Sequence, residues 1–205
     1  SAANGADIKV LNMYSRSPKA FCMYSKDDTL NSPESLKGKT IAGPTGTNLH
    51  ELLVSYQAQA DMTLDDVNYV NMSIPDAKAG LDGGSVDVAL LAGAAAYNAE
   101  KQGCHKVIDG EGLIKAIIAV ATTQKFYDEH PEVIAQLEKS QQEIADFMKE
   151  NPDKTISIVA KELDLDEEAV KDMYGYYDFS LDISDDDKEG FQKTADFMLE
   201  SGMID

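Results

Sequence analysis

The sequence predicts an α/β protein in which a parallel sheet is followed by a mainly helical C-terminal half. Three observations carry this prediction. Between residues 40 and 102, segments with the alternation of strands are each followed by a segment with the period of a helix, which is the order of a parallel α/β sheet. Val86–Leu91 is a nearly continuous apolar run, as in a strand that is covered on both faces. After Gly112 the pattern changes to long helix-period stretches.

The first half of the chain contains the alternating elements. Strands are expected at residues 8–13, 20–25, 40–42, 66–71, 86–91 and 106–108. Helices are expected at residues 48–59, 74–81 and 94–102. Gly43, Pro44 and Gly46 supply the tight turn between the strand at 40–42 and the helix that follows it. Strand–helix alternation of this kind implies a parallel sheet with right-handed crossovers.

The second half begins with the apolar run Leu113–Thr122, which is best explained by a strand. A short helix at residues 124–130 and an amphipathic helix at 131–151 follow. Pro152 breaks the second of these. Further helices are expected at 156–163, at 166–174 and after the cap Ser184–Asp187.

Length and charge limit the function classes. The chain has 205 residues and a formal net charge of −19, so it can form one large or two small domains. Such an acidic surface disfavours binding of nucleic acid or anionic lipid. An anionic ligand would therefore need a local site that overrides the overall field. No run of 18 or more apolar residues is present, so the sequence predicts no membrane span.

The turn Thr45-Gly46-Thr47-Asn48 is the most informative segment, because it stands between a strand and the start of a helix. Free backbone N–H groups and the positive end of the helix dipole meet there, so a carboxylate, sulfonate or phosphate can bind. An ordinary capped helix after a turn is the alternative reading of the same residues.

Residues for catalysis are not grouped in the sequence. The three histidines, His50, His105 and His130, are scattered, and no serine lies in a nucleophile-elbow pattern. The Gly-Pro-Thr-Gly-Thr turn lacks the lysine of a nucleotide-binding P-loop. The two cysteines have no further ligands at metal-binding spacing. The sequence therefore predicts no catalytic residue, no metal and no cofactor.

Three segments in order, SLKGKTIAGPTGTNLHELL, NYVNMSIPDAKAGLDGGSVDVALLAGAAAY and ATTQKFYDEHPEVIAQL, resemble the solute-binding proteins of ABC importers, of the type for sulfonates, taurine and nitrate. The resemblance covers nearly the whole chain. It implies a two-lobed, type II periplasmic-binding-protein-like fold, and a small polar or anionic organic solute held in the cleft between the lobes. It also implies delivery to the membrane subunits of an ABC importer, no enzymatic activity, and an extracytoplasmic protein, periplasmic or a cell-surface lipoprotein, whose signal and anchor lie outside these residues.

The resemblance also predicts the domain division. The first lobe would comprise residues 1–26 and 115–205, and the second lobe residues 27–114. Family members have two further strand–helix units before the segment that begins here at residue 5, so the first lobe is expected to be incomplete. Bare apolar surface on that lobe predicts self-association of the chain, or completion of the lobe by another chain.

The resemblance carries ligand-binding positions onto this sequence one at a time. The turn at residues 45–48 matches the family's second-lobe ligand turn, and residues 91–93 match a strand end that faces the cleft. Residues 14–17 match a first-lobe loop that faces it as well. Asp87 is interpreted as structural. The predicted ligand-binding set is Tyr14, Ser15, Thr45, Gly46, Thr47, Asn48, Leu91, Ala92 and Gly93.

Two other function classes stay open at this stage. The effector domain of a LysR-type transcription regulator has a related two-lobed fold and would sense a metabolite in the cytosol, although the long helices after Pro131 fit that class less well. A small α/β enzyme is the third class, and the lack of a catalytic constellation counts against it. Ligand binding without turnover separates a transport protein from an enzyme, and the N-terminus of the full gene separates it from a regulator.

Overall fold

A computed structural model describes residues 7–200, 202 and 204. The chain forms two compact units. The first unit consists of the described residues of 1–16, 117–195 and 199–205, and the second unit of residues 17–116 and 196–198. Residues 1–6, which the predicted first lobe includes, lie outside the described residues.

The second unit contains a five-stranded sheet of order β4-β3-β5-β2-β6. Its strands are β2 (Phe21–Ser25), β3 (Thr40–Gly43), β4 (Asn68–Asn71), β5 (Val88–Ala92) and β6 (His105–Asp109). Its α-helices are α1 (Asn48–Ala58), α2 (Ile74–Gly83) and α3 (Gly93–Lys101). Short 3-10 turns lie at η2 (Pro18–Ala20), η3 (Pro33–Leu36) and η4 (Leu64–Asp66).

This sheet is mixed, whereas the sequence predicted a parallel one. β3 runs parallel to β4 and β5, but β2 runs antiparallel to β5 and β6. The segment at residues 20–25, which the sequence analysis assigned to the first lobe, is therefore an interior strand of the second unit. The predicted limit at residue 26 was wrong for this segment, because strand pairing is a long-range property that an apolar run does not reveal.

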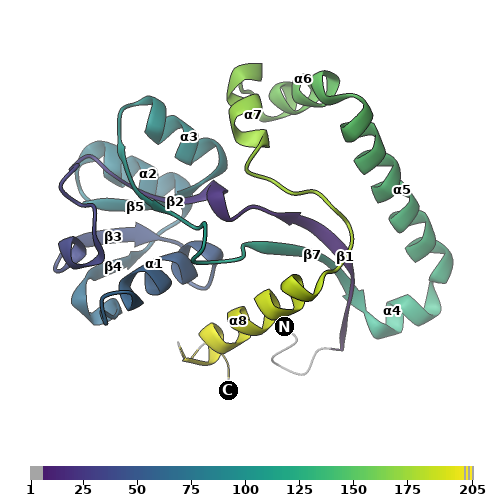
Figure 1. Cartoon of the computed structure of the whole chain (residues 1–205), viewed down its shortest axis with the longest axis horizontal. Coiled ribbons are helices and arrows are strands. Elements are labelled where there is room, and N and C mark those ends of the chain that lie inside the picture. Colours follow the sequence, from purple (N-terminus) through teal and green to yellow (C-terminus); the bar gives the residue numbers. More distant parts are fainter. Residues whose placement is uncertain (1–6, 201, 203, 205) are drawn as a thin grey trace. The chain divides into compact units, whose positions relative to one another are not determined.

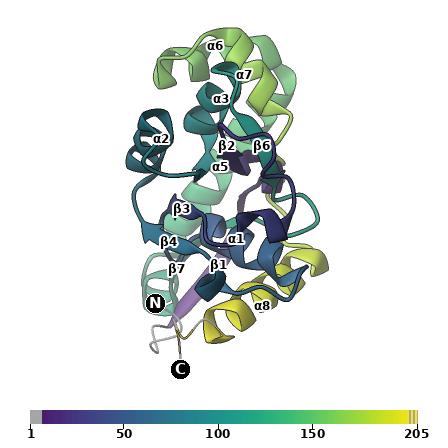
Figure 2. The same cartoon turned by 90° about the vertical axis from the view of Figure 1, so that its left-hand side faces the viewer.

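Helices cover both faces of the sheet (Figures 1 and 2). On the side of α1, the core includes Met23 of β2 and Leu90 of β5. On the side of α2 and α3, it includes Tyr24 of β2 and Leu91 of β5. All four side chains are at most 1% exposed, and the alternation of faces along each strand follows from the two-residue period of a strand. The second unit thus has two continuous core layers around one sheet.

The first unit contains a two-stranded antiparallel sheet and a series of helices (Figure 1). The strands are β1 (Ile8–Arg16) and β7 (Ile117–Thr123). The helices are α4 (Gln124–Glu129), α5 (Pro131–Glu150), α6 (Pro152–Leu163), α7 (Glu167–Tyr174) and α8 (Asp185–Glu200). β7 is shorter than the predicted strand at 113–122, because Ile114 and Ala116 are buried in the core of the second unit instead. No described helix has the length and apolar composition needed to cross a membrane.

A partly buried ion pair connects the end of β1 to the first turn of α8, within the first unit. The guanidinium of Arg16 donates from Nε and Nη2 to the two carboxylate oxygens of Asp187, at 2.5 and 2.6 Å. It also donates to the backbone carbonyls of Ser180 and Asp182, at 2.9 and 2.7 Å. Asp187 is only 1% exposed, and it also accepts hydrogen bonds from the backbone N–H and hydroxyl of Ser184. Bidentate geometry of this kind gives the strong form of an ion pair.

Candidate functional site

The candidate site lies at one edge of the sheet in the second unit, where three parallel strands end. β4, β3 and β5 are neighbours in that order, and they are followed by α2, α1 and α3 respectively. Because the carboxyl ends of parallel strands share one edge, the turn Thr45–Asn48 and the strand end Ala92–Gly93 belong to the same edge. Ligands in open α/β sheets bind outside the carboxyl ends of the strands.

The three helices at this edge differ in how their N-termini are capped. At α2, the hydroxyl of Ser73 accepts the backbone N–H of Asp76 at 3.3 Å. At α1 and α3, the N-cap residues Thr47 and Ala92 make no side-chain cap hydrogen bond. The hydroxyl of Thr47 instead donates to the carbonyl of Pro44 at 2.9 Å. Among the described residues, the side chains of these two N-cap residues thus leave the first N–H groups of α1 and α3 to other acceptors.

Hydrogen bonds to neighbouring elements hold the turn at the start of α1. The backbone N–H of Thr45 donates to Oδ1 of Asn71, at the end of β4, at 3.0 Å. The backbone N–H of Gly46 donates to Nδ1 of His50, one turn into α1, at 3.3 Å. Gly46 has φ of +74°, a left-handed conformation that favours glycine. Thr45, Gly46 and Thr47 are exposed, so this fixed turn is open to a ligand.

The buried side chain of His50 supports the turn at residues 45–48. Its side chain is 3% exposed and stacks on Tyr69 with 5.2 Å between ring centroids, while the Tyr69 hydroxyl donates to the carbonyl of Gly43 at 2.8 Å. Since Nδ1 accepts a hydrogen bond, the proton of the neutral ring lies on Nε2, which is buried with no partner among the described residues. Burial lowers the pKa of His50. The buried ring of His50 therefore supports the turn and does not line the site.

We expect the second unit to lose stability as the pH falls through the range in which free histidine titrates. The pKa of His50 is lowered in the folded state, so its contribution is present above the unfolded-state pKa of about 6.5 and is lost below it, where the unfolded chain takes up a proton. Urea unfolding of wild-type protein and His50→Gln at pH 7.5 and 5.5 measures this. A wild-type loss equal to that of the variant would contradict the assignment to His50.

The remaining sequence-predicted residues have different surroundings. The side chain of Leu91 is 0% exposed and belongs to the core beneath α2 and α3, so it does not reach a ligand. Tyr14 and Ser15 lie on β1 of the first unit, where Tyr14 is 59% exposed and Ser15 is buried. The carboxylate of Asp87 accepts the backbone N–H of Thr40 at 2.8 Å, which confirms its structural role.

Asn71, His50 and Tyr69 form the support of the turn, and the sequence analysis assigned none of them to it. Of these three residues, only Asn71 has a position in the sequence that could have predicted its contact with the turn. It ends a predicted strand next to the strand that carries the turn, so a polar residue there lies at the same sheet edge. The contribution of His50 depends on a ring nitrogen that reaches back along the helix, and no sequence pattern shows this.

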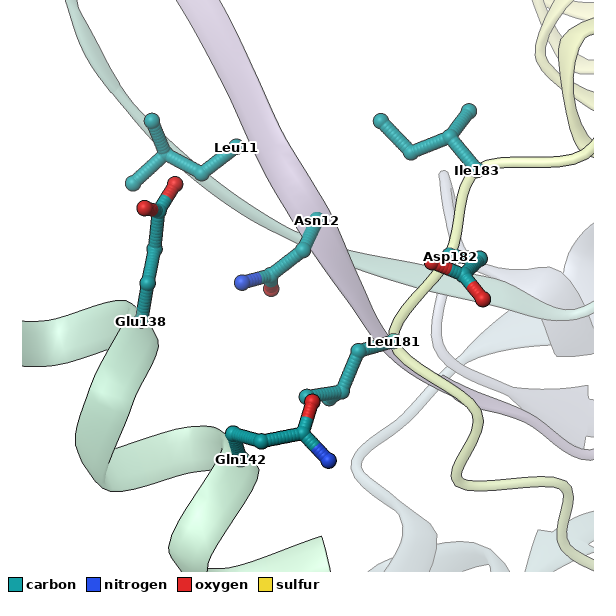
Figure 3. Close-up of a pocket in the computed structure, with 7 residues that line it drawn as sticks. All are labelled: Leu11, Asn12, Glu138, Gln142, Leu181, Asp182 and Ile183. Carbon is teal, nitrogen blue, oxygen red and sulfur yellow. The ribbon is translucent and has the colours of Figure 1, made fainter. Parts of the chain in front are cut away.

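A hollow of about 320 Å³ in the first unit is a weaker candidate (Figure 3). Glu138 of α5 reaches towards Leu11 of β1, Gln142 of α5 reaches towards Leu181, and Asn12 of β1 points into the space between them. The carboxylates of Glu138 and Asp182 line it and repel an anion. The hollow includes no residue of the turn at 45–48. No group of three or more His, Cys, Asp or Glu side chains in the described part of the chain is arranged to hold a metal ion.

The family follows from a sequence comparison. The family model described as NMT1/THI5 like matches residues 1–155, which is most of the chain. The chain belongs to the NMT1/THI5-like family. A search of curated proteins gives no match.

Solved structures show that this family member has the predicted fold. The periplasmic aliphatic sulphonate binding protein SsuA from Escherichia coli matches 99% of this chain with a TM-score of 0.87 at 20% sequence identity, and the match covers 67% of that protein. The alkanesulfonate-binding protein SsuA from Xanthomonas axonopodis pv. citri, bound to MOPS, matches 99% of this chain and 72% of its own, with a TM-score of 0.86 and 20% identity. The predicted two-lobed α/β fold class is confirmed, and the chain spans about two thirds of these relatives.

The same fold also occurs in an enzyme. The desulfurization enzyme DszB matches 97% of this chain and 74% of its own, with a TM-score of 0.73 and 14% identity. A fold alone therefore does not separate binding from catalysis.

Proposed function

We propose that this NMT1/THI5-like protein binds a small organic anion of the sulfonate class and delivers it to an ABC importer outside the cytoplasm. The observation that carries the proposal is the pair of helix N-termini at α1 and α3, which share one sheet edge and have no side-chain cap. The importer and the extracytoplasmic location are supported by the likeness to SsuA from Escherichia coli, a periplasmic aliphatic sulphonate binding protein.

The chemistry of the turn favours an anion with several acceptor oxygens. A sulfonate carries one negative charge on three oxygens, and backbone N–H groups at a helix start donate towards such a group. Each helix dipole favours a negative group by roughly 0.3 to 2 kcal/mol. The net charge of −19 opposes anion binding at long range, but salt screens that field over about 8 Å at physiological ionic strength. The affinity for an anion therefore depends mainly on the groups within the site.

The turn variant Thr47→Asp tests the proposal without removing the fold. Aspartate is a strong N-cap, so α1 should stay formed, while its carboxylate occupies the N–H groups and repels an anion. We expect titration calorimetry with MOPS and with an alkanesulfonate, in a sulfonate-free buffer, to detect binding to the wild-type chain. We expect at least 10-fold weaker binding to Thr47→Asp.

A matched control is Thr63→Ala, because Thr63 caps η4 before β4, at the opposite edge of the same sheet. Its sulfonate affinity should equal that of the wild-type chain. Sulfonate binding that survives Thr47→Asp unchanged, with far-UV circular dichroism intact, would contradict the site. Release of sulfite or another product from a bound sulfonate would contradict a transport role and favour an enzyme.

A further inference from the structure

Two side chains accept hydrogen bonds from the turn at residues 45–48, and one of them can take up a proton. The backbone N–H of Thr45 donates at 3.0 Å to the amide oxygen of Asn71, which does not titrate. The backbone N–H of Gly46 donates at 3.3 Å to Nδ1 of His50. A ring nitrogen accepts a hydrogen bond only while it carries no proton. The hydrogen bond that holds Gly46 therefore depends on the charge state of His50.

Packing keeps the ring of His50 from turning away when it becomes charged. The side chain is 3% exposed. Within the second unit it stacks on Tyr69 and meets Phe197 edge-on, with 5.2 and 5.6 Å between ring centroids. In the neutral ring, Nε2 already lacks a partner among the described residues. An imidazolium in this place would carry a proton on both nitrogens, so that one N–H would face the N–H of Gly46 and the other would face no acceptor.

The surroundings of His50 favour the neutral ring. Of the two rings that face it, Phe197 carries no charge, and burial raises the pKa of the Tyr69 hydroxyl, which therefore stays neutral as well. On α1 itself, the acidic residue of the first turn is Glu51, but the pKa of His50 is lowered by burial and raised by no neighbouring charge. The start of a helix also disfavours a cation, because the positive end of the helix dipole lies there.

We propose that His50 is a positioning residue of the anion site, and that the protein holds its anion only while this ring is neutral. The inference rests on the proposed function. Neutral His50 fixes Gly46 with φ of +74°, and the N–H groups of Thr47 and Asn48 follow directly along the chain, so they keep one orientation. Protonation of the ring removes the acceptor, releases Gly46 and displaces these donors. Acidification would then release a sulfonate even though the sulfonate itself stays charged.

The test is titration calorimetry with butanesulfonate at pH 7.5, 6.5, 5.5 and 5.0, because this ligand stays ionised throughout the range. We expect the affinity of the unmodified chain to fall at least about threefold across it, since one linked proton lowers affinity by up to about tenfold per pH unit below the pKa of His50. His50→Asn places an oxygen acceptor at the same distance along the side chain and cannot take up a proton. It should bind as the unmodified chain does at pH 7.5 and keep that affinity at pH 5.0. His50→Leu, which has no acceptor, should bind at least about tenfold more weakly at every pH, the cost of about one charge-assisted hydrogen bond.

The matched control is the same substitution at another histidine of the second unit, His105→Asn. His105 pairs with Ser25, at the edge of the sheet opposite to the turn, so this variant should keep the loss of affinity in acid. NMR spectra of the unmodified chain without ligand give a second readout. The imidazole of His50 should carry its proton on Nε2 at pH 7.5, and the amide signal of Gly46 should shift with the midpoint at which His50 titrates.

Three results would overturn the role of His50. They are a sulfonate affinity that stays constant from pH 7.5 to 5.0, an affinity that rises in acid, and a Gly46 amide signal that does not follow the titration of His50. A rise in acid would show that the imidazolium attracts the anion. Lack of sulfonate binding at pH 7.5 would instead refute the proposed function. The spectra need neither ligand nor substitution, so they decide the link between His50 and the turn even where a variant does not fold.

Discussion

Replacing Arg16 with alanine should destabilise the first unit by about 3 to 5 kcal/mol, the range for removing one partner of a buried ion pair. The substitution leaves the carboxylate of Asp187, 1% exposed, without its cation. It also removes the donors to the carbonyls of Ser180 and Asp182. Urea unfolding followed by circular dichroism measures the effect. The double variant Arg16→Ala/Asp187→Ala should lose less than the sum of the two single variants, because it leaves no unpaired charge.

A control and a pH series separate the ion pair from general loss of packing. Lys188→Ala breaks the exposed pair with Asp185 and should leave stability unchanged. The hydrogen bond from Arg16 holds the pKa of Asp187 well below its usual range, against the effect of burial, with help from Ser184. The stabilisation is therefore present above the unfolded-state pKa of about 3.9 and is lost as the pH falls below it. An Arg16→Ala variant with the same acid response as the wild-type chain would refute this account.

Replacing Gly43 with alanine should weaken both the second unit and the proposed sulfonate binding. A Cβ at Gly43 would lie 2.5 Å from Cβ of Leu90 on β5, so the backbone of β3 or β5 must move. Overpacking of this kind costs about 1 to 3 kcal/mol. The turn at Thr45–Asn48 follows directly from Gly43, so the same displacement shifts the N–H groups at the start of α1. Thermal unfolding and titration calorimetry with MOPS measure the two effects.

The control for this prediction is the same substitution at Gly83, the last residue of α2. A Cβ there meets nothing within 4 Å, and the backbone conformation is ordinary. Gly83→Ala should keep the wild-type affinity and lose no stability. Equal behaviour of Gly43→Ala and Gly83→Ala would show that contact with Leu90 does not position the turn.

The sequence predicted most elements of the fold because their signals are local. The strand, glycine turn and helix at residues 40–59 occur almost as predicted, since the turn residues and the apolar period act over a few positions. The place of β2 was wrong, because an apolar run does not show which sheet a strand joins. The start of the strand at 113–122 was wrong because Ile114 and Ala116 are apolar for another reason, namely burial in the second unit.

The sequence predicted only the part of the candidate site in which backbone N–H groups would bind the ligand. Thr45, Gly46, Thr47 and Asn48 were found because a glycine turn before a helix has a recognisable spacing. The sequence could not show that the hydroxyl of Thr47 turns to Pro44 rather than to the helix N–H groups, because both orientations are open to a threonine at that position. The sequence also could not show that the side chain of Leu91 is buried in the core and does not face a ligand, because Leu91 lies within an apolar run.

The order of the two units along the chain affects how the protein folds during synthesis. The sheet of the second unit lies within residues 17–116, so all of its strands leave the ribosome in one continuous stretch. The first unit has to wait, because β1 pairs with β7 in a register that joins Ile8 to Thr123. At about 5 to 20 residues per second, β1 remains without its partner strand for roughly 5 to 20 s. For most of that interval the second unit is also incomplete, because β6 ends only at Asp109 and Ile114 belongs to its core, so chaperones have access to the unpaired β1 until shortly before β7 is made.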